Sequence, residues 1–341
     1  MLQVVWFLLW GLLWGIYFVL DGFDLGMGTI LPFLASNEDE RRVIFNAAGP
    51  FWDGNEVWLI TAGGVTFAAF PLAYAVLFSA LYAPLLILLF ALIFRAVSFE
   101  FRNKIDSPQW RKIWDTVQFL GSFLPALLLG VAFAGLFQGI PINEKGVYTG
   151  TILSLLNVYG LLGGLFFVVM FAVHGCTWLS LKSEGYLQEK ADRCALKLWP
   201  LLVLLAVAFL VATFFYTPLF NIFLRILPLS IIPLLAVVLL LVFPAFVRSG
   251  KRVTAFAVSA LFILLVTLFG VIGMFPNVVP SNINPEYSIT IAKSASSQLT
   301  LTIMLCVALV CVPIVIIYQA WVYSVFSHKV TKAELDSDHA Y

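Results

Sequence analysis

Apolar stretches with few charges recur along the whole 341-residue chain, and this repetition constrains the fold more than any other feature. A helix needs about 20 apolar residues to cross the hydrocarbon core of a bilayer. Only helices and closed barrels satisfy their backbone polar groups there. Charged residues make up 11% of the chain, whereas soluble domains carry about 25%. The sequence therefore predicts an all-α integral membrane protein.

We expect nine membrane-spanning helices, the second and third being separated only by a tight turn at Pro71. Their approximate bounds are 4–34, 51–70, 72–95, 114–138, 152–181, 197–216, 222–246, 253–275 and 298–326. The first basic residue is Arg41, so the basic segment that opens a cleavable signal peptide is missing. We expect the first helix to remain as an anchor.

The basic residues gather in alternate connecting segments. All of the 19 Lys and Arg except Lys145, Arg225 and Lys293 fall on one side of the predicted spans. The positive-inside rule places that side in the cytoplasm, so the N-terminus lies outside and the tail 327–341 lies inside. This orientation requires an odd number of spans, which nine satisfies. The net charge of +1 and the lack of a long basic cluster give no indication of a nucleic-acid partner.

The first predicted helix carries two distinct faces. Small residues line one of them, at Gly11, Gly15, Gly22 and Gly26. Such a stripe lets a neighbouring helix approach closely. Asp21 and Asp24 lie one turn apart on another face, together with Trp10 and Tyr17. A helix with a glycine face and an acidic face has little surface left for lipid, so we expect it inside the bundle.

A carboxylate inside the membrane costs about 2.5–3.5 kcal/mol even on a lenient insertion scale, so it should be protonated, paired or in contact with water. Two interpretations of Asp21 and Asp24 stay open. They form a structural ion pair or interhelical hydrogen bond, or they belong to a proton path. Arg95, at the end of the third span, is the expected counter-ion in both cases, with Asp24 as its expected partner.

The second predicted helix begins with the unusual stretch PFWDGNEVW. Asp53 and Glu56 share one helical face, Asn55 lies between them, and Trp58 points the other way. One interpretation is structural: Asp53 is favoured by the helix dipole, and Trp52 and Trp58 are interfacial anchors. The other is that protons enter at this helix end. Two acidic pairs on adjacent spans at similar depth favour the second.

Glu100 and Lys104 follow the third span, one turn apart if the segment is helical. A line from Lys104 and Glu100 through Asp53 toward Asp24 would run inward from the cytoplasm. A proton-uptake route needs such an arrangement.

Histidine is scarce, and His174 is the only one of three histidines in a predicted span. The chain therefore cannot supply a bis-histidine haem site, and we expect His174 to be hydrogen-bonded inside the bundle. The four cysteines show no C-x-x-C spacing, and three of them fall in apolar runs. We expect these to be buried free thiols. No sequence motif indicates a metal site or a redox centre.

Several stretches together form a recognisable set. They are DGFDLGMG at 21–28, NEDERR at 37–42, FWDGNEVWLITAGG at 51–64, FRAVSFEFRNKI at 94–105, RKIWD at 111–115, GSFLPALLLGVAFAGLFQG at 121–139, GMFPNVVPS at 273–281 and SSQLTL at 296–301. In these stretches the chain resembles subunit II of the bacterial cytochrome bd-type quinol oxidases. The resemblance runs from residue 4 to beyond residue 320, and the run from WDGN to VWLITAGG is highly specific.

The resemblance implies a multi-pass subunit of a bacterial inner-membrane enzyme that oxidises quinol, reduces dioxygen to water and takes protons from the cytoplasm. It implies that haems b and d lie in the partner, subunit I, and that this chain binds none. It also implies a four-helix bundle in 1–138, a second one in 152–275 and a peripheral ninth helix at 298–326. A structural quinone and small single-helix accessory subunits stay open as further partners, beside membrane lipid.

The resemblance also implies roles for individual residues. The proton route attributed to the family falls on Asp53 in the WDGN motif and on Glu100 and Lys104. The family's first-span aspartate and third-span arginine fall on Asp24 and Arg95. Where this chain has Glu100 some relatives have aspartate, an exchange that preserves proton-carrying chemistry.

Two other functions stay open from the residues themselves. One is a purely structural partner of the haem subunit that conducts no protons. The other is a self-sufficient proton channel or transporter. Transporters usually show inverted repeats with broken helices at the midplane, and no clear repeat is visible in the sequence.

Overall fold

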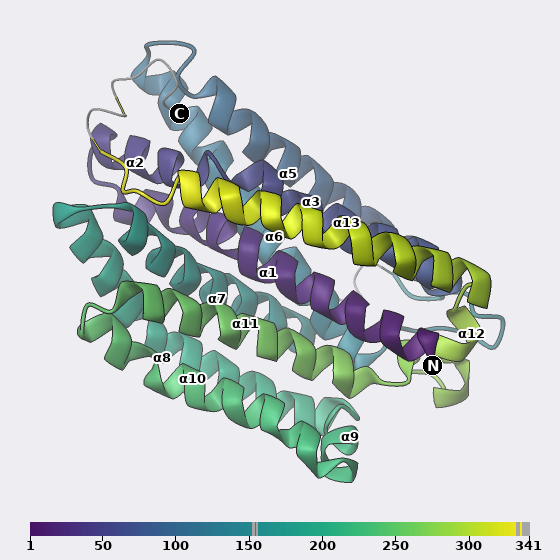
Figure 1. Ribbon diagram of the computed structural model, residues 1–341. Coiled ribbons are helices and arrows are strands. Elements are labelled where there is room, and N and C mark those ends of the chain that lie inside the picture. Colours follow the sequence, from purple (N-terminus) through teal and green to yellow (C-terminus); the bar gives the residue numbers. More distant parts are fainter. Residues whose placement is uncertain (152–153, 155, 332–334, 336–341) are drawn as a thin grey trace.

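The computed structural model describes residues 1–151, 154, 156–331 and 335, which form an elongated helical bundle (Figure 1). Its α-helices in chain order are α1 (Leu2–Leu34), α2 (Glu38–Ala48), α3 (Trp52–Ala69), α4 (Pro71–Ala80), α5 (Tyr82–Phe101), α6 (Pro108–Gln138), α7 (Val158–Lys182), α8 (Gly185–Tyr216), α9 (Phe220–Arg225), α10 (Ile231–Arg248), α11 (Arg252–Met274), α12 (Ile291–Ser294) and α13 (Gln298–Val325). Two short strands, β1 (Asn277–Val279) and β2 (Ile289–Thr290), pair antiparallel.

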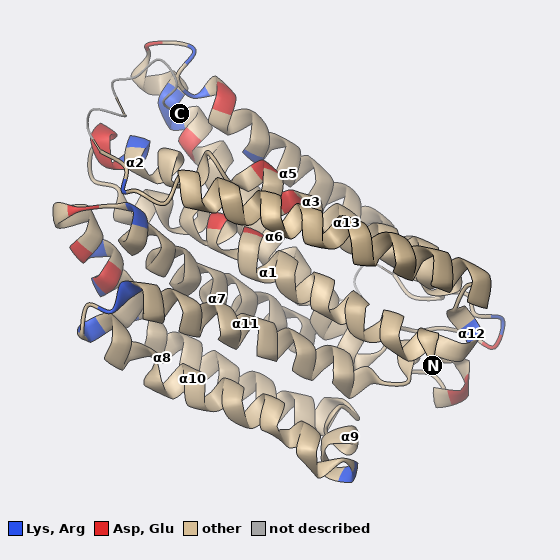
Figure 2. Ribbon diagram, viewed as in Figure 1, with Lys and Arg blue, Asp and Glu red and all other residues tan. Residues whose placement is uncertain are grey.

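Among the described residues, eight helices are long and apolar enough to cross a membrane. They are α1, α5, α6, α7, α8, α11, α13 and the helical stretch Leu227–Arg248 that contains α10. Figure 2 shows most Lys, Arg, Asp and Glu residues at the end of the bundle where α2 lies, with few at the opposite end. The chain is an all-α, multi-pass membrane protein.

The predicted span 72–95 is not one helix. It is divided at Leu81 into α4 and α5, and α5 continues to Phe101. Pro84 explains the interruption, because it has no N–H to donate to the carbonyl of Ala80 and its ring clashes with that carbonyl.

The predicted span 222–246 is also interrupted. It consists of α9, a 3₁₀ turn at Leu227–Ser230 and α10. Pro228 at the start of the turn cannot continue the hydrogen bonding of α9. Two helices begin six or more residues earlier than expected: α6 at Pro108 rather than 114, and α8 at Gly185 rather than 197.

The predicted span 152–181 is observed as α7, which begins at Val158 after the N-cap Asn157. Residues 152, 153 and 155 of that prediction, and most of the predicted tail 327–341, lie outside the described residues.

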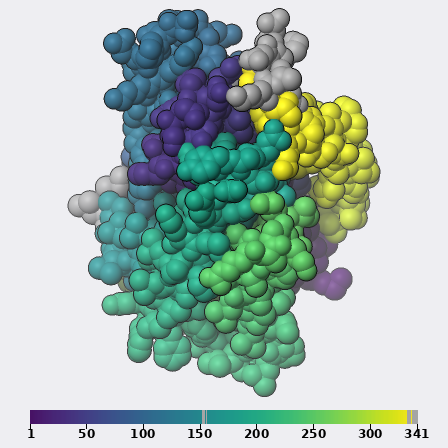
Figure 3. Space-filling model, turned by 90° about the vertical axis from the view of Figure 1, so that its left-hand side faces the viewer, coloured from purple at the N-terminus to yellow at the C-terminus, as the bar shows by residue number. Residues whose placement is uncertain are grey.

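Helix α1 occupies the centre of the bundle. It packs against α3 and α6 from the first half of the chain and against α7 and α11 from the second half. In Figure 3 these two halves occupy the upper and lower parts of the molecule, with α13 at one side. Gly11 and Gly15 meet α11, while Gly22 and Gly26 meet α7; a Cβ at Gly26 would overlap the carbonyl oxygen of Phe171. The predicted close helix approach at the glycine face is confirmed.

A buried acid cluster as the candidate functional site

Arg95 of α5 lies at the centre of a buried acid cluster between α1, α3 and α5. Its Nη2 lies 2.7 Å from Oδ1 of Asp21, and both side chains are fully buried. The same nitrogen pairs with Oε1 of Glu56 on α3. Gly121 of α6 permits this placement, because a Cβ at that position would lie only 2.9 Å from the Cβ of Arg95.

The sequence predicted Asp24 as the partner of Arg95, and the structure corrects this to Asp21. Residues three apart on a helix differ by about 60° around its axis, so Asp21 and Asp24 meet different neighbours. Asp24 accepts a hydrogen bond from Nδ2 of Asn55 at 2.7 Å. The coarser expectation, that Arg95 neutralises an aspartate of the first helix, is confirmed.

Asn55 links three helices. Its Nδ2 donates to Asp24 and also to the carbonyl oxygen of Leu20 at 3.2 Å, while its Oδ1 accepts from the hydroxyl of Tyr323 at 2.9 Å. The side chain therefore uses both ends of its amide, toward α1 and toward α13. Tyr323 was not identified from the sequence, because an aromatic residue in an apolar span gives no signal of a polar contact.

The acid cluster has more acids than bases. Three carboxyl groups share the single guanidinium of Arg95: those of Asp21 and Glu56 contact it, and that of Asp24 lies within electrostatic reach. Oδ2 of Asp21, Oδ1 of Asp24, and Nε and Nη1 of Arg95 have no hydrogen-bond partner among the described residues. Buried polar groups normally bond to protein or to ordered water, and uncompensated charge in a membrane interior is expensive. The arrangement is chemically suited to holding and exchanging protons.

Asp53 lies in the first turn of α3 and is exposed, one turn before Glu56. Its Oδ1 accepts a hydrogen bond from the backbone N–H of Gly54 at 2.7 Å. Glu56 is intermediate, with 22% of its side chain exposed. On α3, Asp53 therefore lies at the surface, and Glu56, one turn further along, contacts the buried guanidinium of Arg95 on α5.

The two tryptophans of the WDGN segment pack inside the chain. Trp58 is buried, and its Nε1 donates to Oε1 of Gln319 at 2.9 Å. Trp52 stacks on Phe99 with 5.4 Å between ring centroids and 3° between planes. Trp58 is therefore not an interfacial anchor, since its hydrogen bond to Gln319 links α3 to α13.

Glu100 and Lys104 are both exposed. Helix α5 ends at Phe101, so Lys104 lies beyond the helix and the expected one-turn spacing does not hold. Among the described residues, no ion pair joins Lys104 to Asp53 and no hydrogen bond joins Glu100 to it.

A second charged network at Arg102 was missed by the sequence analysis. The guanidinium of Arg102 is bidentate to Glu38, at 2.8 and 2.9 Å, and lies 2.6 Å from Oδ1 of Asp115. Partial burial acts to raise the pKa of Glu38, but the hydrogen bonds and positive charge of Arg102 outweigh it and hold this pKa below its usual range. The alternating charges of NEDERR and RKIWD were the available signal.

His174 is buried, and both ring nitrogens are hydrogen-bonded, to Ser259 Oγ at 2.7 Å and to the carbonyl oxygen of Val19 at 3.0 Å. This confirms the expected hydrogen-bonded role. Cys176 is buried as expected, but Cys306 and Cys311 are exposed. The prediction of buried thiols is wrong for these two, because Leu301 is the only buried residue of α13.

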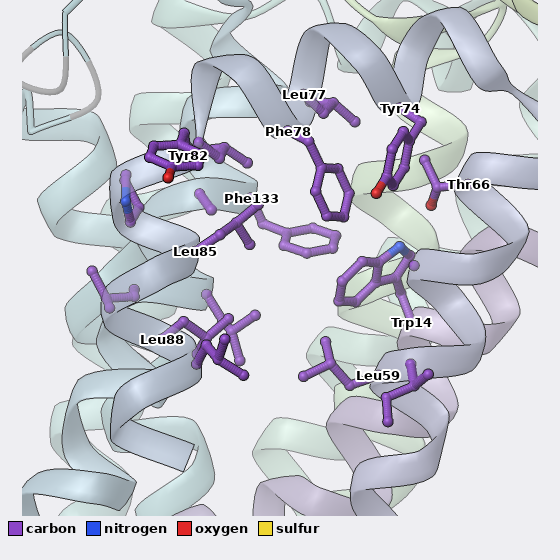
Figure 4. Close-up of a pocket in the computed structure, with 18 of the residues that line it drawn as sticks. Trp14, Leu59, Thr66, Tyr74, Leu77, Phe78, Tyr82, Leu85, Leu88 and Phe133 are labelled. Atoms are coloured by element: carbon purple, nitrogen blue, oxygen red, sulfur yellow. The ribbon is translucent and has the colours of Figure 1, made fainter. Parts of the chain in front are cut away.

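A cavity of about 620 Å³ lies between α1, α3, α4, α5 and α6. Figure 4 shows the rings of Trp14, Tyr74, Phe78 and Phe133 around it, with leucines completing the walls. Nε1 of Trp14 is buried and has no partner among the described residues. The sequence did not predict this cavity.

Comparison with known proteins places these features in a family. The family model for "Cytochrome bd terminal oxidase subunit II" matches residues 2–326. The chain is 39% identical to the "Probable cytochrome oxidase subunit 2" of Haemophilus influenzae, over 95% of this chain and 93% of that protein. It is 38% identical to the "Cytochrome bd-I ubiquinol oxidase subunit 2" of Escherichia coli K12, over 98% and 97% of the two chains.

Two further comparisons agree. The chain is 37% identical to the "Cytochrome bd ubiquinol oxidase subunit 2" of Bacillus subtilis, over 98% of both chains. A chain of the solved bd oxidase from Geobacillus thermodenitrificans has the same fold, with a TM-score of 0.76 at 15% identity over 95% of this chain and 98% of that one. The specific motifs, the helical fold and the whole-length matches lead to one conclusion: this chain belongs to the cytochrome bd terminal oxidase subunit II family.

Proposed function

We propose that this chain is the non-haem subunit II of a bacterial quinol oxidase and works in complex with the haem-bearing subunit I in the inner membrane. The family membership and the names of the relatives from E. coli and B. subtilis support this assignment. The haems of subunit I supply the oxygen chemistry. This chain supplies structural support and a route by which protons from the cytoplasm reach the complex, contributing to the proton motive force.

The observation that carries the proton role is the excess of buried carboxyl groups over basic groups around Arg95. In the proposed path a proton arrives from water, by way of the exposed Glu100 and Lys104, at the exposed carboxyl of Asp53. It passes to Glu56, which lies one turn further along α3 and contacts Arg95. Asp21 and Asp24 then hold protons at the buried end of the path. A purely structural partner would have no need for more acids than Arg95 can neutralise.

The proposed topology has nine spans, with the N-terminus outside and the C-terminus in the cytoplasm. Helix α3 is the ninth span beside the eight apolar helices; its polar first turn lowers its hydropathy, but its 18 residues extend for about 27 Å. The charge asymmetry between the two bundle ends supports this orientation. Reporter fusions after Lys145 and after Lys329 should report opposite compartments, and the same compartment for both would refute the topology.

The cavity beside Trp14 fits a structural quinone. Its apolar walls suit an isoprenoid tail. A bound quinone would supply two-electron redox chemistry, although we propose only a structural role here. The exposed apolar surface of α13 fits lipid or small single-helix accessory subunits.

The proposed function is tested by purifying the complex through a tag on this chain. We expect subunit I to copurify, with a haem spectrum and quinol-dependent oxygen consumption. The chain expressed without subunit I should show no Soret band. If it purifies alone and conducts protons in vesicles, it is a channel; if it carries stoichiometric haem alone, the division of labour is wrong.

A further inference from the structure

Tyr323, near the C-terminal end of α13, begins a hydrogen-bonded chain that ends at Asp24. Its hydroxyl donates to Oδ1 of Asn55 at 2.9 Å, and Nδ2 of Asn55 donates to Oδ2 of Asp24 at 2.7 Å. A helix at the side of the bundle is thus connected to a fully buried acid through one amide.

Neighbouring aromatic rings fix the direction of the hydroxyl of Tyr323. Its ring lies 4.6 Å from that of Phe51 and 5.8 Å from that of Trp178, measured between centroids, the latter in an edge-to-face arrangement. These contacts come from the segment before α3 and from α7. The phenol therefore has a defined direction, although α13 exposes most of its other side chains.

The amide of Asn55 links the hydroxyl of Tyr323 to the protonation state of Asp24. An ionised carboxyl group only accepts hydrogen bonds, so Asn55 must present its NH₂ to an ionised Asp24. The donated bond from Tyr323 to Oδ1 and the bond from Nδ2 to the carbonyl oxygen of Leu20, at 3.2 Å, hold that orientation together. Without the hydroxyl, only the longer bond to Leu20 remains, so the amide turns over more readily and can offer its oxygen to a protonated Asp24. The hydroxyl therefore favours the ionised form of Asp24 over the protonated form.

We infer that Tyr323 is a positioning residue for proton exchange at Asp24: through Asn55, it keeps Asp24 able to release the proton that it receives. This inference rests on the proposed function. The other charged groups within electrostatic reach of Asp24 are Asp21 on the same helix, Glu56 on α3 and Arg95 on α5. All three remain unchanged when the hydroxyl of Tyr323 is removed.

The test is the pH profile of oxygen consumption by the purified complex carrying Tyr323→Phe, with rates normalised to haem content. The alkaline limb should move to higher pH by about half to one unit, and the rate at the optimum should fall about two- to tenfold, as expected for the loss of one hydrogen bond. Because the effect passes through Asn55, the double variant Tyr323→Phe with Asn55→Leu should match Asn55→Leu alone.

Two control variants separate positioning from helix docking. Tyr318→Phe changes a phenol that is 61% exposed on the same helix and should leave the profile unchanged. Gln319→Leu removes the bonds from α13 to Gly54 O, at 2.8 Å, and to Trp58, at 2.9 Å, without touching Asn55. It should weaken docking but leave the alkaline limb in place.

The inference is overturned if Tyr323→Phe keeps the parental profile, or if Gln319→Leu moves the alkaline limb equally. Asp24→Asn is measured beside these variants to separate the inference from the proposed function. If Asp24→Asn turns over at the parental rate, the proposed proton role of Asp24 fails. If Asp24→Asn is slow while Tyr323→Phe behaves as the parent, only the inference about Tyr323 fails.

Discussion

Replacing Arg95 with methionine removes the cation of the buried acid cluster while keeping a side chain of moderate length. Asp21 loses a partner at 2.7 Å, and Glu56 loses its contact with the same nitrogen. Since Arg95 and Asp21 are fully buried, water does not readily replace the lost interactions.

The expected loss of stability follows from two independent arguments. Removing one partner of a buried pair costs about 3–5 kcal/mol. Alternatively, Asp21 takes up a proton, and neutralising an aspartate of ordinary pKa near 3.9 at pH 7 costs about 4 kcal/mol. The second cost falls by about 1.4 kcal/mol for each unit by which the pH is lowered. The loss at pH 7 should therefore be about 4 kcal/mol and should shrink in acid.

The assay is the yield and thermal midpoint of the haem-loaded complex, measured at pH 7 and pH 5.5. Arg95→Met should lower both quantities, and less so at pH 5.5. Adding Asp21→Asn should recover part of the loss, because it removes the stranded charge. Adding Asp24→Asn should recover less, since Asp24 bonds to Asn55 instead. Equal or greater recovery with Asp24→Asn would refute the pairing described above.

Two further predictions concern helix packing and the second charged network. Gly26→Ala should sharply reduce assembly of the complex, because its Cβ would overlap the backbone of α7. The control Gly63→Ala should be tolerated, since a Cβ there meets nothing within 4 Å. Equal yields of complex for the two variants would contradict the close approach of α1 to α7. The folded-state pKa of Glu38 is lowered, so its stabilisation is present above about pH 4.3 and is lost as the pH falls further. Glu38→Gln should therefore destabilise the complex at pH 7 by less than about 1 kcal/mol, because 39% of the side chain is exposed. The difference from the parent should shrink as the pH falls below about 4.3 and through the lowered pKa of Glu38. A difference that does not shrink in acid would contradict the charge origin.

Much of the fold could be predicted from the sequence because membrane helices are marked by length and apolarity alone. The glycine face of α1 could be predicted from helical spacing. The breaks near Leu81 and at Pro228 were missed because the apolar pattern runs straight through them, and only proline's missing N–H reveals them. Helix α8 begins earlier than predicted because its polar N-terminal segment is helical without being apolar.

The acids of the candidate site could be recognised because charge is rare in this chain. The sequence did not show which acid pairs with Arg95. Asp21 and Asp24 differ by only about 60° around α1, and the choice depends on how α3 and α5 pack. The cavity beside Trp14 depends on the spacing of five helices. Near it, Gly63 and Gly64 leave open space, a property that sequence alone does not distinguish from a packing glycine.

Proton uptake by the complex carrying Asp53→Asn tests the central claim most directly. Asparagine keeps the shape of Asp53 and can accept the bond from Gly54, but it cannot release and regain a proton. The complex should assemble with full haem content, reduce oxygen slowly and show impaired proton uptake from the cytoplasmic side in reconstituted vesicles. Glu100→Gln should give a weaker form of this defect, because water can bypass an exposed position. Parental turnover with normal proton uptake in Asp53→Asn would show that Asp53 is structural and that protons take another route.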